Sequence, residues 1–211
     1  ASHASPCFAS MRIPRLYFPQ ALVSGETIHI SGQAAHHVSH VLRLRAGTGI
    51  SIFDGQGNEY HAVVHEIGRA EVTATIGGPA AGIAEPALQI TLAQGIARND
   101  RMDLILQKAV ELGVTTIQPL WTQRCQTHLK AARLEKRIRH WQGVIISACE
   151  QCGRSTLPQL EAPDTYSHWL SGLPAGGCRL MLQPAGSSRL RSLQPPQGGI
   201  CLLVGPEGGL N

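Results

Sequence analysis

Residues 88–120 read LQITLAQGIARNDRMDLILQKAVELGVTTIQPL, and this stretch decides the fold class of the chain. A short apolar run, 88–96, precedes a segment whose apolar residues recur at helical spacing, and a second apolar run, 115–120, follows it. Asp100 is a good N-cap for the helix, and Gly113 is a good residue to end it. The apolar stripe of this helix consists of Met102, Ile105, Leu106, Ala109 and Leu112. The order of strand, helix and strand predicts a parallel sheet.

The same order continues to the end of the sequence. A long helix is predicted from about residue 133 to residue 151, and two buried strands are predicted in RLMLQP (179–184) and ICLLVG (200–205). The apolar face of the long helix consists of Leu134, Ile138, Trp141, Ile145 and Ala148. We therefore expect an α/β domain whose parallel sheet is covered on both faces.

The first part of the chain has a different pattern, with short alternating runs and turn residues. Residues 49–67 predict a β-hairpin whose loop is Asp54-Gly55-Gln56-Gly57-Asn58, where the glycines accept positive φ. The segment AEVTAT (70–75) predicts another strand, and residues 34–44 place apolar side chains at the spacing of a short helix. This half predicts a small β-barrel with one covering helix.

Composition and punctuation give the domain boundaries. Residues 1–10 show no signal peptide and are interpreted as a tag or upstream remnant, since Met11 is a natural start. We expect the barrel in 11–78, a linker rich in Gly, Pro and Ala in 79–88, and the α/β domain in 89–211. No stretch approaches the roughly 20 apolar residues of a membrane helix.

Charge and cysteine content leave two questions open. The formal net charge is +4, and arginine supplies most of it; this fits a phosphate-binding protein, but a high-GC genome enriches arginine equally well. The six cysteines are too sparse for a disulfide scaffold. Cys149 and Cys152 form a single C-x-x-C with no second pair to complete a zinc site, so free thiols in a reducing cytoplasm are expected.

Ligands of open parallel sheets collect beyond the carboxyl ends of the strands. Chemistry-bearing residues stand in three segments there: Arg124 in WTQRCQT, Glu150 and Arg154 in ACEQCGR, and the loop 205–209, GPEGG. The loop lacks both nucleotide fingerprints, G-x-G-x-x-G and G-K-[ST], and favours an adenosyl group over a pyrophosphate. A plain tight turn remains an alternative for the loop, and surface salt bridges remain one for the arginines, including a pair between Glu150 and Arg154.

The barrel carries a basic set of its own: Arg12, Arg15, Arg43 and Arg45. A basic barrel suits RNA phosphates, but a charged rim of a structural domain fits as well. His36, His37 and His40 lack an acidic or cysteine partner, so no metal is expected.

Taken together, the segments MRIPRLYF, HHVSHVLRLRAG, FDGQGNEY, MDLILQKAVELGV, TQRC, ACEQCGR and LLVGPEGGL occur in the order seen in RsmE-type enzymes. The chain resembles this family from Met11 onward. The family consists of SPOUT-class methyltransferases that modify N3 of a uridine in 16S ribosomal RNA.

The resemblance implies a PUA-like RNA-binding barrel and a SPOUT domain with a C-terminal trefoil knot. It also implies S-adenosylmethionine as cofactor, 16S ribosomal RNA as partner, and a cytoplasmic homodimer. The residues it implies for organising the uracil are Arg124, Glu150 and Arg154; no residue is assigned as the general base. The implied cofactor-binding residues are Leu182, Gln183, Pro184, Val204, Gly205, Pro206, Glu207, Gly208 and Gly209. The implied RNA-binding residues are Arg12, Arg15, Arg43, Arg45 and Arg101.

Members of the family continue past the GPEGG loop with the segment that closes the knot, so we expect the methyltransferase domain in 89–211 to be C-terminally incomplete. Two other functions remain open. One is a SPOUT enzyme for another RNA nucleotide, and the other is a non-catalytic RNA-binding or ribosome-assembly protein.

Overall fold

The structure, a computed structural model, describes residues 13–98, 100–122, 131–173, 176–183, 186, 190–193, 196, 198–206 and 209. The interpretation of residues 1–10 as an upstream remnant lies outside these residues. The chain forms two compact units, Ala1–Gly82 and Ile83–Asn211. The exact bounds expected for the barrel and the linker stay a prediction, and β-structure of the first unit continues to Pro79.

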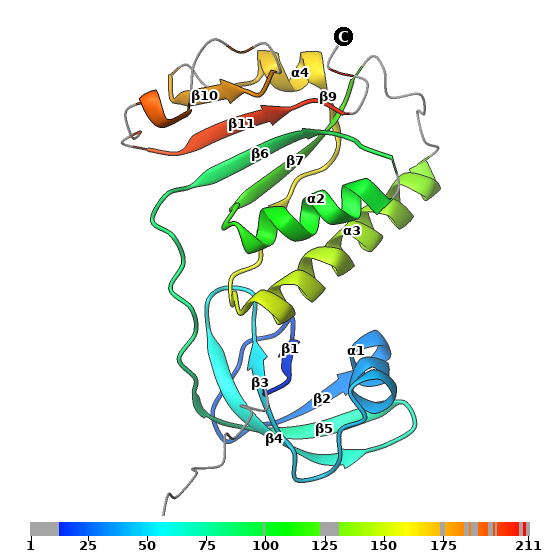
Figure 1. Cartoon of the computed structure of the whole chain (residues 1–211). Helices are drawn as coiled ribbons and strands as arrows, with labels where there is room; N and C mark the ends of the chain where they lie inside the picture. Colours follow the sequence, from blue (N-terminus) through cyan, green and yellow to red (C-terminus); the bar gives the residue numbers. More distant parts are fainter. Residues whose placement is uncertain are drawn as a thin grey trace, which may run out of the picture. The chain divides into compact units, whose positions relative to one another are not determined.

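The first unit is a curved five-stranded sheet with a short helical segment (Figure 1). Its strand order is β1-β3-β4-β5-β2, and every pair is antiparallel except β1 with β3. The path is open, so the predicted barrel is a half-barrel. Its elements are β1 (Arg15–Tyr17), β2 (Thr27–Ser31), α1 (Gly32–His36), η1 (His37–Val41), β3 (Gly49–Phe53), β4 (Glu59–Ile67) and β5 (Glu71–Pro79).

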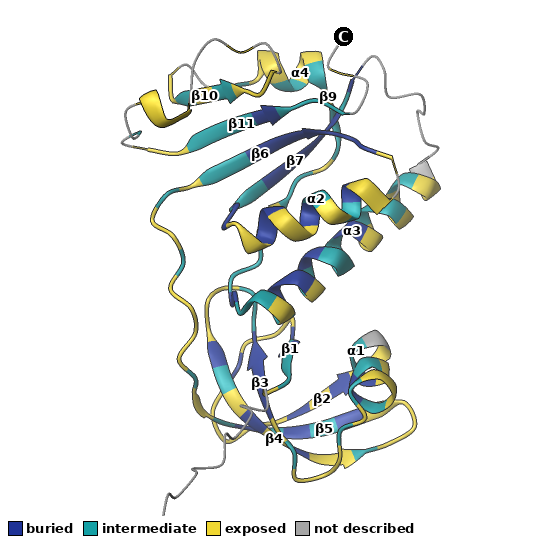
Figure 2. Cartoon of the chain, viewed as in Figure 1, coloured by how far each residue is buried: buried dark blue, intermediate teal, exposed yellow. Residues whose placement is uncertain are grey.

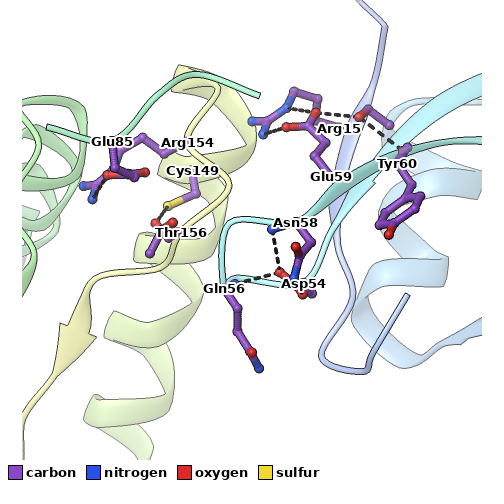
Figure 3. Close-up of polar contacts among 11 residues, drawn as sticks. Arg15, Asp54, Gln56, Asn58, Glu59, Tyr60, Glu85, Cys149, Arg154 and Thr156 are labelled. Atoms are coloured by element: carbon purple, nitrogen blue, oxygen red, sulfur yellow. Dashed lines mark hydrogen bonds and ion pairs between the residues drawn. The ribbon is translucent and has the colours of Figure 1, made fainter. Parts of the chain in front are cut away.

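The predicted hairpin is confirmed as β3 and β4. Asp54 closes its loop by accepting hydrogen bonds from the backbone N–H groups of Gln56 and Asn58 at 2.7 and 3.2 Å, drawn in Figure 3. Gly55 and Gly57 have φ of 80° and 103°, a conformation that glycine adopts without steric cost. The alternation along these strands places every second side chain in one apolar core.

The predicted short helix is present, but its second half is a π-helix, η1. Val38 of η1 is completely buried in the core of this unit. Arg43 follows with φ of 52°, the left-handed conformation, and the next N–H group, that of Leu44, bonds to the carbonyl oxygen of Val38 at 3.1 Å.

The second unit is a parallel sheet with strand order β10-β11-β6-β7-β8, and β9 also pairs with β7 (Figure 1). The predicted α/β class with a parallel sheet is confirmed; the trefoil knot stays a prediction. The elements are β6 (Ile90–Gly95), α2 (Asp100–Glu111), β7 (Thr116–Trp121), α3 (Ala131–Cys152), β8 (Gln159–Leu160), β9 (Asp164–Thr165), α4 (Tyr166–Ser171), β10 (Cys178–Met181), η2 (Leu190–Ser192) and β11 (Ile200–Val204).

Helices α2 and α3 pack together, and buried positions alternate with exposed ones along both (Figure 2). Most of the stripe predicted for α2 is confirmed, but Leu112 is 78% exposed. The helix ends at Glu111, so Leu112 leaves the helical face, and Val110 is buried instead. In α3 the buried face contains Trp141 and Ile145, as predicted.

Strands β10 and β11 are predicted to be buried, but both are only partly buried. Figure 2 shows β10 with intermediate and exposed positions, whereas β6 and β7 are mostly buried. The physical reason is position, since β10 is the edge strand of the sheet. The other face of the sheet carries a small core of Ala93, Leu120 and Leu203, on which Tyr166 and Trp169 of α4 pack.

We predict that Leu106→Ala lowers the free energy of unfolding of the second unit by about 2–5 kcal/mol, because Leu106 is completely buried and its truncation leaves a cavity. Leu104 on the same helix is 54% exposed, so Leu104→Ala is the matched control and should change stability by less than about 0.5 kcal/mol. All three tryptophans, Trp121, Trp141 and Trp169, lie in this unit, so urea unfolding followed by tryptophan fluorescence measures it selectively. Equal losses in the two variants would contradict the described burial.

Candidate active site at the carboxyl edge of the sheet

The carboxyl ends of β10, β11 and β6 meet at one edge of the sheet because these strands are parallel neighbours. Val204 is in register with Gln94, and Met181 with Leu203. The next residue of β10's segment, Leu182, donates its N–H to the carbonyl oxygen of Leu203 at 3.0 Å. The predicted cofactor residues that the structure brings together here are Leu182, Gln183, Val204, Gly205, Pro206 and Gly209. The others, Pro184, Glu207 and Gly208, lie outside the described residues.

The loop after β11 lies directly against the end of β6. A Cβ atom added to Gly95 would lie 2.4 Å from Cδ and 2.7 Å from N of Pro206, closer than real Cβ atoms approach other atoms. The buried Gln94 holds the loop from the neighbouring position, because its Nε2 donates to the carbonyl oxygens of Gly95 at 2.9 Å and Gly205 at 3.4 Å. Gly95 is therefore required for this close approach.

The loop itself turns back sharply. The N–H group of Gly209 donates to the carbonyl oxygen of Pro206 at 2.9 Å, and Gly209 has φ of 84°. Pro206 lacks an N–H group, and none of the described loop residues has a cationic side chain. Backbone carbonyls and close-packed glycines suit a group recognised by shape and by hydrogen-bond acceptors, such as an adenosyl group, better than a pyrophosphate.

Gln94 and Gly95 were missed by sequence reasoning. A polar Gln-Gly pair at the end of an apolar parallel strand was the available signal, since such a pair indicates the edge at which ligands bind. Thr122 was also missed. It follows β7 at the same edge of the sheet and is only 6% exposed.

Arg154 lies elsewhere, at the opposite edge of the unit. Its Nη1 donates to the carbonyl oxygens of Val110, in the last turn of α2, and of Val114, in the connection to β7, at 3.0 and 2.9 Å. Its Nε and Nη2 bind the carboxylate of Glu85, with Nη2 2.7 Å from Oε2 (Figure 3). Arg154 is 6% exposed, so these contacts are buried and the guanidinium binds the protein's own groups.

The three predicted uracil-organising residues are thus not gathered at the carboxyl edge by the described part of the chain. Arg124 lies outside the described residues. Glu150 lies in the last turn of α3, close in sequence to Arg154, and the carboxylate of Glu85 binds Arg154. The contacts described for Arg154 are those of a structural residue, and the role predicted for it beside the uracil stays a prediction.

The predicted RNA-binding arginines also differ in position. The guanidinium carbon of Arg15 lies 4.8 Å from the ring centroid of Phe53. Arg15 donates from Nε and Nη2 to Glu59 at 2.9 and 2.8 Å (Figure 3). This pair is nearly buried, so Arg15 stabilises the first unit rather than presenting a free charge. Arg43, Arg45 and Arg101 are exposed, and Arg12 lies outside the described residues.

Cysteines and histidines form no metal site in the described part of the chain. The cysteines described there, Cys149, Cys152, Cys178 and Cys201, are free. Burial raises the pKa of the Cys201 thiol, and the nearby charge of Arg179 offsets this in part. A thiol with a raised pKa stays protonated and is a poor nucleophile, which argues against covalent catalysis at this position.

Comparison with known proteins agrees with this arrangement. A family described as the RNA methyltransferase PUA domain matches residues 30–77, and a family described as an RNA methyltransferase domain matches residues 84–211. The second match covers more than half of the chain, so the fold and the glycine-rich edge belong to an RNA methyltransferase with an N-terminal PUA domain.

More specifically, the chain belongs to the ribosomal RNA small subunit methyltransferase E family. It is 30% identical to the protein of that name from Buchnera aphidicola subsp. Schizaphis graminum over 200 residues, which is 95% of this chain and 81% of the relative. The crystal structure of ribosomal RNA small subunit methyltransferase E from Neisseria gonorrhoeae bound to S-adenosyl methionine matches with 38% identity and a TM-score of 0.89, over 94% of this chain and 82% of that one.

A second solved structure is similarly close. The putative methyltransferase of Legionella pneumophila, in complex with the bound cofactor SAM, matches with 35% identity and a TM-score of 0.88 over 95% of this chain and 82% of that chain. No helix in the described part of the present chain has the length and apolar character needed to cross a membrane.

We predict that Arg154→Ala destabilises the second unit by about 3–5 kcal/mol, because it leaves the Glu85 carboxylate and two buried carbonyl groups without their donor. The control is Arg139→Ala, which removes an exposed pair with Glu135 at 3.8 Å and should change stability by less than about 0.5 kcal/mol. Urea unfolding by tryptophan fluorescence measures both. An Arg154→Ala protein of normal stability that had lost its activity would instead support the role predicted from sequence.

Proposed function

We propose that this protein transfers the methyl group of S-adenosylmethionine to N3 of a specific uridine in 16S ribosomal RNA. Family membership supports the reaction class, and two similar structures carry S-adenosylmethionine. The observation in this chain that carries the proposal is the packing of Gly205 and Pro206 on Gly95, because it places backbone and glycine at the edge of the sheet where ligands of parallel sheets bind.

The chain's own residues fit this cofactor. When bound, S-adenosylmethionine supplies an electrophilic methyl group on a cationic sulfonium. We place it against Gly205, Pro206 and Gly209, with Leu182 and Gln183 at the neighbouring strand end. The side-chain amide of Gln94 donates a hydrogen bond to the carbonyl oxygen of Gly205. We infer that this contact preorganises Gly205 for the cofactor.

The substrate side follows from the chemistry of uracil. N3 lies between two carbonyl groups and carries a proton, so it becomes nucleophilic only after that proton is lost. The resulting charge spreads over O2 and O4, where arginine donors stabilise it. Arg124, two residues after Thr122 in sequence, is the arginine we propose for this role; Glu150 remains a candidate to organise the base.

The RNA itself must present an unpaired uridine, because N3 is on the Watson–Crick edge of the base. We propose that the first unit holds the surrounding phosphates through two exposed arginines after η1: Arg43, which adopts the left-handed conformation, and Arg45. We further propose that the protein acts as a homodimer in the cytoplasm, where ribosomal subunits are assembled.

Deleting the gene should remove N3-methyluridine from 16S ribosomal RNA. Adding the purified full-length protein and S-adenosylmethionine to that RNA should restore the modification. Mass mapping of the RNA measures both. An unchanged level of N3-methyluridine would exclude this substrate, and loss of another modification would identify a different RNA nucleotide. A protein that binds RNA but shows no heat of binding with S-adenosylmethionine would be the non-catalytic alternative.

Gly95→Ala should weaken S-adenosylmethionine binding at least tenfold, because the added Cβ atom displaces Pro206 and with it the loop. Overpacking of this kind also costs about 1–3 kcal/mol of stability. The matched control is Gly143→Ala in α3, whose Cβ atom would contact nothing within 4 Å. Gly143→Ala should retain cofactor affinity and be about as stable as the native protein or slightly more. Native affinity in Gly95→Ala, measured by isothermal titration, would show that the loop is not part of the cofactor site.

A further inference from the structure

Thr122 has a buried hydroxyl group for which the described part of the chain supplies no partner. Its side chain is 6% exposed, and among the described residues Oγ1 is the buried side-chain oxygen or nitrogen that makes no hydrogen bond. A buried hydroxyl group without a partner is unfavourable, because it loses the hydrogen bonds that water would give it. Such a group at a ligand-binding edge points to a ligand that completes it.

The position of Thr122 in the sheet places it beside the proposed cofactor wall. Thr122 follows Trp121, the last residue of β7, and β7 pairs with β6 so that Leu120 is in register with Gly95. The carboxyl ends of both strands therefore lie at the same edge of the sheet.

The face of the sheet is also the same. Side chains alternate along a strand, so Thr122 continues the face of Leu120, two residues earlier, and Gly95 shares that face through the register. It is on this face that a Cβ atom of Gly95 would meet Pro206. The unpartnered hydroxyl group and the loop are thus on one side of the sheet, at the ends of adjacent strands.

We propose that Thr122 Oγ1 is a cofactor-binding group that hydrogen-bonds to a polar atom of bound S-adenosylmethionine, an inference that rests on the proposed function. The hydroxyl group donates one hydrogen bond and accepts others, so it suits either a donor or an acceptor of the cofactor. The protein leaves it unpaired to keep it available for the ligand, at the expense of stability in the free state.

The test is isothermal titration of the full-length protein with S-adenosylmethionine and, in parallel, thermal unfolding with and without it. Thr122→Val keeps the shape of the side chain and removes the hydroxyl group. We expect about tenfold weaker binding, the effect of losing one hydrogen bond in a buried site. We also expect that unfolding without cofactor occurs at the same or a higher temperature, because an unsatisfied group has been removed. Thr122→Ser, which retains the hydroxyl group, should bind within about threefold of the native protein.

The matched control is Thr115→Val, at the other end of the same strand. Thr115 Oγ1 donates to the carbonyl oxygen of Ile90 at 3.0 Å and accepts from its N–H group at 3.0 Å. The same substitution there should lower the unfolding temperature and leave cofactor affinity unchanged. A hydroxyl group with a structural role would give this result at both positions.

The outcomes separate the inference from the function on which it rests. Native cofactor affinity in Thr122→Val, or a marked loss of its stability without cofactor, overturns the role of Thr122 while the methyltransferase function stands. No binding of S-adenosylmethionine by the native protein overturns the proposed function, and with it this inference.

Discussion

The buried guanidinium of Arg154 is the contact on which the arrangement of the α/β unit most depends. It joins three segments that are far apart in sequence: the stretch before β6 through Glu85, the end of α2 through Val110 and Val114, and its own position just after α3. Removing Glu85 would leave the buried Arg154 charge without its carboxylate partner, which costs more than the pair contributes. These contacts hold the three segments together near the amino-terminal ends of β6 and β7.

The opposite edge is organised by close approach rather than by charge. Gly95 has no Cβ atom, and Gly205 and Pro206 occupy the space that a side chain would fill. Gln94 holds the loop through a carbonyl group, and Thr122 leaves a hydroxyl group unsatisfied on the neighbouring strand. The buried ion pair thus lies at one edge, and the described buried hydroxyl group without a partner lies at the edge proposed to bind cofactor.

Four of the described arginines illustrate two situations that differ in burial. Arg15 and Arg154 each bind a glutamate more than 40 residues away in sequence, in surroundings from which water is largely excluded. Arg43 and Arg45 are exposed beside a left-handed turn, so their charges are available to phosphates. The net charge of +4 therefore does not mean that every arginine presents its charge to RNA. The RNA-facing charge of the first unit is proposed to come from the turn after η1.

The sequence by itself determined the elements with several periods of pattern: the α2 and α3 helices, the strands β6 and β7, and the hairpin around Asp54. Local periodicity and turn chemistry decide such segments. It missed the two-residue strands β8 and β9 and the short α4, which have too few residues to show a period. It also assigned Leu112 to the buried face of α2, although the helix ends at Glu111, one residue earlier. Only the tertiary structure decided which carboxylate Arg154 binds, why position 95 must be glycine, and that Thr122 is buried without a partner. Each of these depends on atoms brought together across the sheet from distant parts of the chain, and no local pattern carries that information.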